Sequence, residues 1–142
     1  MKPVSATLEA ACPPAVLFGW VDDLARYPRW LDLVQRAEPA GDETWTVVLA
    51  ARMGPLRRSK QLTMVRTRCE PGRLVRFERR EPDGKRHAAW TLQAAVMATR
   101  DGSELTMTMT YDGQWWGPVV ERVLTEEIDR ARPRLAALAA AG

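Results

Sequence analysis

Hydrophobic and polar positions alternate at the start of the chain, and this alternation predicts a β-strand over residues 4–11. Every second residue from Val4 to Ala10 is apolar, and the residues between them are polar. Successive side chains of a strand point to opposite faces, so the pattern is that of a strand with one buried face.

Helical spacing follows directly after this strand. Two prolines at 13 and 14 end the strand, and a proline in the first turn is well placed to begin a helix. Apolar residues then recur at helical spacing from Val16 to Leu24. Pro28 interrupts the run, because the residue before a proline is pushed out of the helical region. The pattern therefore predicts two consecutive short helices.

From residue 34 onward, β-branched and aromatic runs alternate with turn residues, which is typical of an antiparallel meander. Each divider, such as Gly54-Pro55, supplies turn chemistry. The predicted strands are 34–38, 44–53, 59–70, 73–81, 86–98 and 104–112.

The period returns to that of a helix after Gly117-Pro118. Apolar residues recur from Val120 to Leu138, with mostly charged residues opposite, so a long amphipathic helix is predicted. Pro133 is expected to kink it, because proline removes a backbone hydrogen bond and clashes with the preceding turn. One domain over residues 1–142 accommodates all of these elements.

The last two predicted strands indicate which face of the sheet turns inward. Apolar side chains alternate with threonine and glutamine, and a half-buried antiparallel strand places its apolar set against the core. The predicted inward set is Trp90, Leu92, Ala94, Val96, Leu105, Met107, Met109 and Tyr111.

This order of elements is similar to that of the START-like, or SRPBCC, superfamily of polyketide cyclases and lipid-binding proteins. Residues 23–30, DLARYPRW, resemble its helix-turn segment, and residues 73–77, 90–92 and 102–106 resemble successive strands. The resemblance implies an α+β helix-grip fold. In this fold a curved antiparallel sheet of six to seven strands wraps around the C-terminal helix, and two short helices follow the first strand. It also implies a cavity between sheet and helix for an apolar or amphipathic ligand.

Aromatic and apolar side chains are the candidate lining of such a cavity, since stacking and sulfur contacts suit planar and lipid-like ligands. Each of them could equally be ordinary core, although six tryptophans exceed what packing of a domain this size usually needs. The candidate ligand-binding residues are Tyr27, Trp30, Trp45, Met64, Phe77, Trp90, Leu92, Met107, Met109, Trp116, Val120, Leu124 and Ile128.

Arg66 and Arg68 share strand parity with Met64, so they point inward if Met64 does. The alternative is that they are surface arginines and that Val65 points inward. Residues around Arg68 resemble the strand in aromatase/cyclases whose arginine orients the polyketide chain and stabilises an enolate. The candidate catalytic residues are these two arginines and Tyr111, because a fixed cation can stabilise a developing oxyanion and polar groups in the cavity can assist proton transfer.

Composition narrows the function classes. The chain has 21 basic and 18 acidic residues, a net charge of +3, and 46% hydrophobic residues, which is typical of a globular domain. Its basic residues are scattered among acidic ones without interleaved aromatics, so we expect no nucleic-acid partner. No apolar run approaches the roughly 20 residues of a membrane span, so membrane insertion is not expected and the protein is predicted to be cytoplasmic.

Residues that could carry other chemistry are few. Cys12 and Cys69 are interpreted as reduced core thiols, and no metal-ligand spacing or phosphate loop occurs, so no metal and no cofactor are predicted. His87 is the only histidine and is expected to face solvent, and Glu127 is expected to be a surface charge on the last helix. The sequence leaves open whether the chain forms a homodimer.

Two functions from different classes remain. One is a polyketide cyclase/dehydrase-like enzyme, in which the cavity folds a reactive poly-β-keto chain and a few polar groups assist proton transfer. The other is a protein that binds or carries a lipid, isoprenoid or polyphenol without chemistry. A third and weaker alternative is a regulatory protein that acts through its surface.

Overall fold

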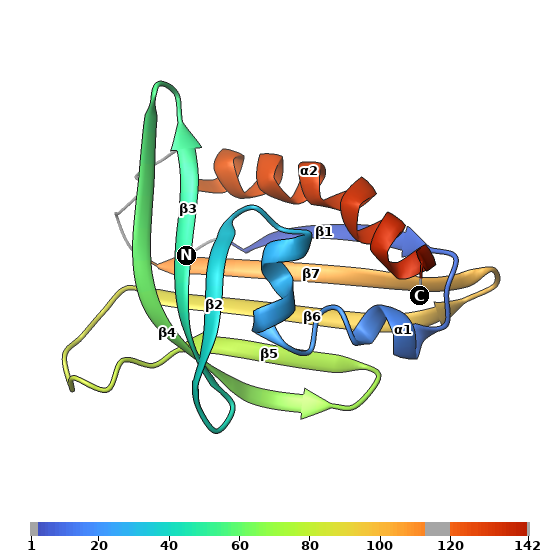
Figure 1. The fold of residues 1–142 in the computed structure, drawn as a ribbon, viewed down its shortest axis with the longest axis horizontal. Coiled ribbons are helices and arrows are strands. Elements are labelled where there is room, and N and C mark those ends of the chain that lie inside the picture. Colours follow the sequence, from blue (N-terminus) through green and yellow to red (C-terminus); the bar gives the residue numbers. More distant parts are fainter. Residues whose placement is uncertain (1–2, 113–119, 142) are drawn as a thin grey trace.

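The computed structural model describes residues 3–112 and 120–141, and a curved sheet lies against a long C-terminal helix (Figure 1). After the first strand come a short α-helix and a 3-10 helix, then the rest of the sheet and the last helix. The elements are β1 (Val4–Ala10), α1 (Pro14–Phe18), η1 (Leu24–Arg29), β2 (Val34–Gly41), β3 (Thr44–Met53), β4 (Leu56–Glu70), β5 (Leu74–Arg79), β6 (Ala89–Thr99), β7 (Gly102–Asp112) and α2 (Val120–Ala141).

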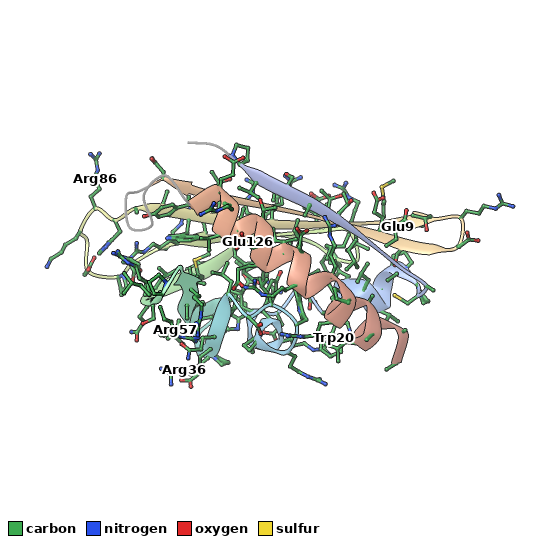
Figure 2. All side chains as sticks on the ribbon, turned by 90° about the horizontal axis from the view of Figure 1, so that it is seen from above. Glu9, Trp20, Arg36, Arg57, Arg86 and Glu126 are labelled. Carbon is green, nitrogen blue, oxygen red and sulfur yellow. The ribbon has the colours of Figure 1, made fainter. Side chains whose placement is uncertain are left out.

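The strands of the described chain form one antiparallel sheet in the order β1-β7-β6-β5-β4-β3-β2. Consecutive strands from β2 to β7 are neighbours, and β1 closes the far edge against β7. Figure 2 shows α2 running obliquely across the sheet, and Figure 1 places α1 and η1 on the same side. The predicted α+β helix-grip fold is confirmed.

The β3–β4 hairpin is longer than the sequence predicts. β4 begins at Leu56 rather than at residue 59, because the turn spans only two residues and Met53 pairs with Leu56. Gly54 in this turn has a φ of 63°, a left-handed conformation that glycine adopts without strain.

The segment before β6 is a loop, so the strand predicted over 86–98 begins later, at Ala89. Asp83 holds this loop: its carboxylate accepts the backbone N–H of Lys85 at 2.9 Å and contacts His87 Nε2 at 3.0 Å. His87 is exposed, as predicted.

The helices differ from the sequence prediction in their bounds. α1 ends at Phe18, earlier than the apolar spacing indicates. Pro28 lies inside η1, and Pro133 lies inside α2 without ending it. Pro133 is exposed, so the carbonyl left without its backbone donor can be hydrated.

The predicted inward face of β6 and β7 is confirmed. The register pairs Trp90 with Tyr111 and Leu92 with Met109, so the apolar sets of the two strands share one face. All eight predicted side chains are buried, and most of the side chains between them are only partly so.

The two cysteines have different surroundings. Both are free thiols, and Cys12 is buried with its Sγ 3.7 Å from the Oγ of Ser103. Cys69 lies one residue before the end of β4 and is exposed, so the prediction of a core thiol is wrong there.

Candidate ligand-binding site

An interlocked group of aromatic side chains lies between η1 and the sheet. The Tyr27 ring lies 4.7 Å from that of Trp30 and 6.1 Å from that of Phe77, and Phe77 lies 5.5 Å from Trp45. The two contacts of Phe77 are edge-to-face, an arrangement that aromatic quadrupoles favour. These four predicted ligand-binding residues are thus packed against one another.

Hydrogen bonds fix the polar atoms of this group. Tyr27 Oη donates to the Val21 carbonyl at 2.8 Å, and Trp30 Nε1 donates to the Trp20 carbonyl at 3.1 Å. Burial raises the pKa of Tyr27 well above its usual value. These hydrogen bonds hold the segment between α1 and β2 in place, so the role of Tyr27 and Trp30 is structural.

Trp45 is held by a carboxylate that also begins η1. Asp23 Oδ1 accepts the Trp45 Nε1–H at 3.2 Å and the backbone N–H of Ala25 at 2.9 Å. The second contact is an N-cap, which satisfies a donor at the start of a helix. One side chain thus ties η1 to β3.

A small apolar cavity lies beside this group, walled by the inner face of the sheet. Its volume is about 30 Å³, on the scale of a water molecule or a methyl group. The lining is Leu24, Leu31, Leu33, Val34, Val47, Leu49, Leu62, Met64, Trp90, Thr91, Leu92 and Met109.

A second void under α2 is smaller still, about 10 Å³, and touches Trp30, Met107 and Ile128. Leu124 is buried on the same helix. Within residues 3–112 and 120–141, side chains therefore almost fill the space where the sequence predicts a ligand-sized hollow. Trp116 and the side chain of Val120 lie outside the described part of the chain.

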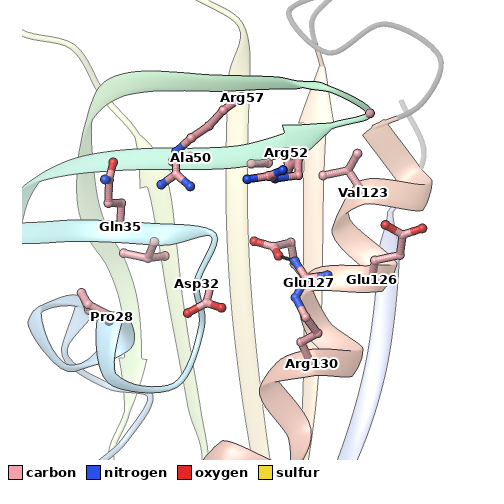
Figure 3. Close-up of a pocket in the computed structure, with 13 residues that line it drawn as sticks. Pro28, Asp32, Gln35, Ala50, Arg52, Arg57, Val123, Glu126, Glu127 and Arg130 are labelled. Carbon is pink, nitrogen blue, oxygen red and sulfur yellow. Dashed lines mark ion pairs between the residues drawn. The ribbon is translucent and has the colours of Figure 1, made fainter.

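The large open space lies elsewhere, in a cleft of about 600 Å³ between the β2–β3–β4 edge and α2 (Figure 3). This volume is within the range of small-molecule sites. Val34 lines both this cleft and the apolar cavity, so the two adjoin. The cleft lining is Pro28, Asp32, Val34, Gln35, Ala50, Ala51, Arg52, Gly54, Arg57, Val123, Glu126, Glu127 and Arg130.

The acidic groups of the cleft are largely paired. Glu127 is only 4% exposed and forms an ion pair with Arg130, one helical turn away. Asp32 accepts a hydrogen bond from Arg134 Nη1 at 2.5 Å. The prediction of Glu127 as a surface charge is wrong, because its helical spacing from Val123 places it on the buried face of α2.

A β-bulge separates the two arginines that share parity in the sequence. The β4–β5 register shifts between Arg66 and Arg68, so Arg66 lies opposite buried Phe77 and Arg68 lies opposite Arg76 on the other face. Arg68 is half-exposed and pairs with Glu70. The parity that ties Arg68 to Met64 therefore fails, because an extra residue reverses it, and Arg68 is the surface arginine of the alternative interpretation.

Arg66 lies on the inner face of the sheet, but its guanidinium is engaged in contacts that join β4 to two other segments of the chain. Its guanidinium contacts Glu43 Oε1 through Nη2 at 2.8 Å and donates through Nη1 to the Asp22 carbonyl at 3.0 Å. The hydrogen bond with Glu43 raises the pKa of Arg66. Of the three candidate catalytic residues, Tyr111 alone is buried in the interior, with its ring 4.5 Å from that of Trp90.

The cleft residues Arg52, Arg57 and Glu127 were not among the predicted site residues. A two-residue turn at Gly54-Pro55 is a sequence signal that places Arg52 opposite Arg57 in a hairpin. No local signal joins this hairpin to α2, because the contact spans some 70 residues of chain and is made only by the curvature of the sheet.

The described residues contain no group of three or more histidine, cysteine or acidic side chains that could hold a metal ion. No helix among them is long and apolar enough to cross a membrane.

The family described as "Polyketide cyclase / dehydrase and lipid transport" matches residues 1–140. The chain belongs to this family. No curated protein matches the sequence.

Solved structures with the same fold cover almost the whole chain. A START superfamily protein from Mycobacterium smegmatis is 14% identical over 98% of this chain and 97% of its own, with a TM-score of 0.72. The protein TTHA0849 from Thermus thermophilus is 16% identical over 99% and 98%, with a TM-score of 0.71. The di-domain ARO/CYC StfQ from the steffimycin biosynthetic pathway is 16% identical over 98% of this chain and 50% of its own, with a TM-score of 0.67. At these identities the similarity establishes the fold.

Proposed function

We propose that this member of the polyketide cyclase/dehydrase and lipid transport family binds a small amphipathic molecule in the cleft beside α2. The observation that carries the proposal is that a cleft of about 600 Å³ adjoins an apolar cavity at a shared residue, Val34. The polar part of a ligand would remain in the cleft, and its apolar part would lie toward the cavity.

The apolar cavity is small, so an apolar group enters it by moving side chains. Met64 and Met109 lie in its wall, and methionine is unbranched and can change rotamer to fit irregular shapes. Trp90 and Leu92 supply further apolar surface. The interior thus offers an adaptable wall rather than a preformed hollow.

The expected energy of apolar contact is modest. Burying about 200 Å² of apolar ligand surface contributes about 5 kcal/mol at 25 cal/mol per Å². Part of this is offset by the lost freedom of the ligand and the cost of moving side chains. Apolar contact alone therefore predicts weak binding, and polar contacts in the cleft are needed for tighter binding.

A polyketide cyclase-like enzyme is the second candidate, and the position of Tyr111 favours it. Tyr111 is buried on the inner face beside Trp90, where its hydroxyl could assist proton transfer to a bound poly-β-keto chain. The other two candidates, Arg66 and Arg68, are engaged with Glu43 and Glu70. We therefore favour the binding function. If the protein is an enzyme, we propose that Tyr111 is its catalytic residue.

Calorimetric titration with decanol, a neutral amphipathic probe, tests the proposal. Gln35 lines the cleft and is exposed, so Gln35→Trp should fill the cleft without disturbing the core and should weaken decanol binding about tenfold or more. The matched control is Gln61→Trp, an exposed glutamine on β4 outside the cleft lining. Absence of saturable binding by the folded parent protein, or equal loss in both variants, would overturn the proposal.

Tyr111→Phe separates the two candidates. If the protein is an enzyme, the variant retains affinity for a poly-β-keto thioester but no longer cyclises it. If it is a carrier, both proteins return the thioester unchanged, as followed by mass spectrometry.

A further inference from the structure

Two arginines face each other across the β3–β4 hairpin at the edge of the cleft. Arg52 and Arg57 are direct cross-strand partners, one residue pair before the turn, and both line the cleft. Within residues 3–112 and 120–141 neither guanidinium has an ion-pair or hydrogen-bond partner, while most other charged residues of the cleft are paired.

This arrangement has an electrostatic cost. Like charges directly opposite each other on antiparallel strands destabilise the sheet. Because they are direct partners, the two side chains leave the same face of the hairpin: Figure 3 shows Arg57 extending across β3 over Ala50, and Arg52 directed into the cleft from β3 itself. An anion placed between the two guanidinium groups would turn this repulsion into attraction.

Arginine suits such a role because its planar fork matches the oxygens of a carboxylate or a phosphate. The local acids do not already fill the position. Glu127 is paired with Arg130 and Asp32 with Arg134. Glu126 also lines the cleft, but among the described residues its carboxylate forms no ion pair with Arg52 or Arg57.

We propose that Arg52 and Arg57 form a subsite for the anionic head group, a carboxylate or a phosphate, of the amphipathic ligand. This inference rests on the proposed function and adds the chemical class of the ligand. The head group lies between the two guanidinium groups. The apolar body passes Val34, which lines the cleft and the apolar cavity alike.

The test compares decanol, decanoate, decyl phosphate and inorganic phosphate by calorimetric titration. The variant is Arg52→Gln/Arg57→Gln, and the matched control is Arg86→Gln/Arg100→Gln, which removes the same charge from two exposed loop positions. Figure 2 shows Arg86 projecting into solvent from the loop between β5 and β6. Thermal unfolding checks that all proteins are folded, and removal of the like-charged pair should leave the variant at least as stable as the parent.

The parent protein should bind decanoate or decyl phosphate about tenfold or more tighter than decanol, which corresponds to about 1.4 kcal/mol. The double variant should lose this preference, so that either anion binds to it no more than about twofold tighter than decanol does, and the control should keep the preference.

Four results would overturn the inference, and the first two of them leave the proposed function standing. If decanol binds but neither anion binds more tightly, the anion subsite is wrong and the proposed function stands. If the double variant keeps the preference, the two arginines are not the subsite. If inorganic phosphate alone binds, and only to proteins with both arginines, the site takes a free anion and the amphipathic ligand is wrong. If none of the four binds, both proposals fall.

Discussion

Replacing Phe77 by alanine asks whether the aromatic group under η1 is core or ligand wall. Phe77 is 0% exposed and contacts the rings of Tyr27 and Trp45 edge-to-face. Truncation of a buried phenylalanine costs about 3–5 kcal/mol, through lost transfer energy and the cavity that remains. Each lost aromatic pair accounts for about 0.5–1.5 kcal/mol within that range.

The corresponding thermal shift is large enough to measure cleanly. At about 2.1 cal/mol/K per residue, the 142-residue chain has an unfolding entropy of about 0.3 kcal/mol/K. Phe77→Ala should therefore lower Tm by about 10–17 °C in differential scanning calorimetry. Phe77→Leu, which keeps most of the apolar volume but loses both aromatic pairs, is the control and should cost about 1–3 kcal/mol.

A cost below about 1 kcal/mol for Phe77→Ala would refute the reasoning. It would mean that the ring borders space that solvent or ligand can occupy, as the sequence alone suggests, and is not packed core.

Three other substitutions test separate features of the structure. Arg52→Gln should raise the free energy of unfolding by about 0.2–1 kcal/mol in urea titrations at low salt, by removing repulsion with Arg57, and the gain should shrink in 1 M NaCl, where the Debye length is about 3 Å. If Arg52→Gln lowers the free energy of unfolding instead, the claim that the two arginines repel each other is wrong. Gly102→Ala should cost at least about 1–3 kcal/mol, because its Cβ would lie 2.2 Å from the Ala10 carbonyl oxygen; a neutral result would exclude this contact between β1 and β7. Burial raises the pKa of Glu81, but hydrogen bonds from a guanidinium and a backbone N–H outweigh it and lower the pKa below the ordinary 4.5. The stability that these bonds contribute is present above pH 4.5 and is lost as the pH falls through the lowered pKa, so the deficit of Glu81→Gln should be largest at neutral pH and vanish in acid.

The order of elements and the inward face of the last strands can be predicted from the pattern of apolar and polar residues alone. Periods of two and of 3.6 residues are local properties, and they give β3, β7 and α2 nearly at their observed bounds. The parity of Trp90 and Met109 follows from the same alternation, because a strand exposes its two faces in strict succession.

Which side chains share a site depends instead on contacts between distant parts of the chain. One extra residue in the bulge after Arg66 turns Arg68 to the opposite face, and the sequence carries no mark of it. The burial of Glu127 depends on how α2 rolls on the sheet, and the filling of the interior depends on how Tyr27, Phe77 and Trp45 interlock. Each of these is a contact between segments distant in sequence, which local periodicity does not encode.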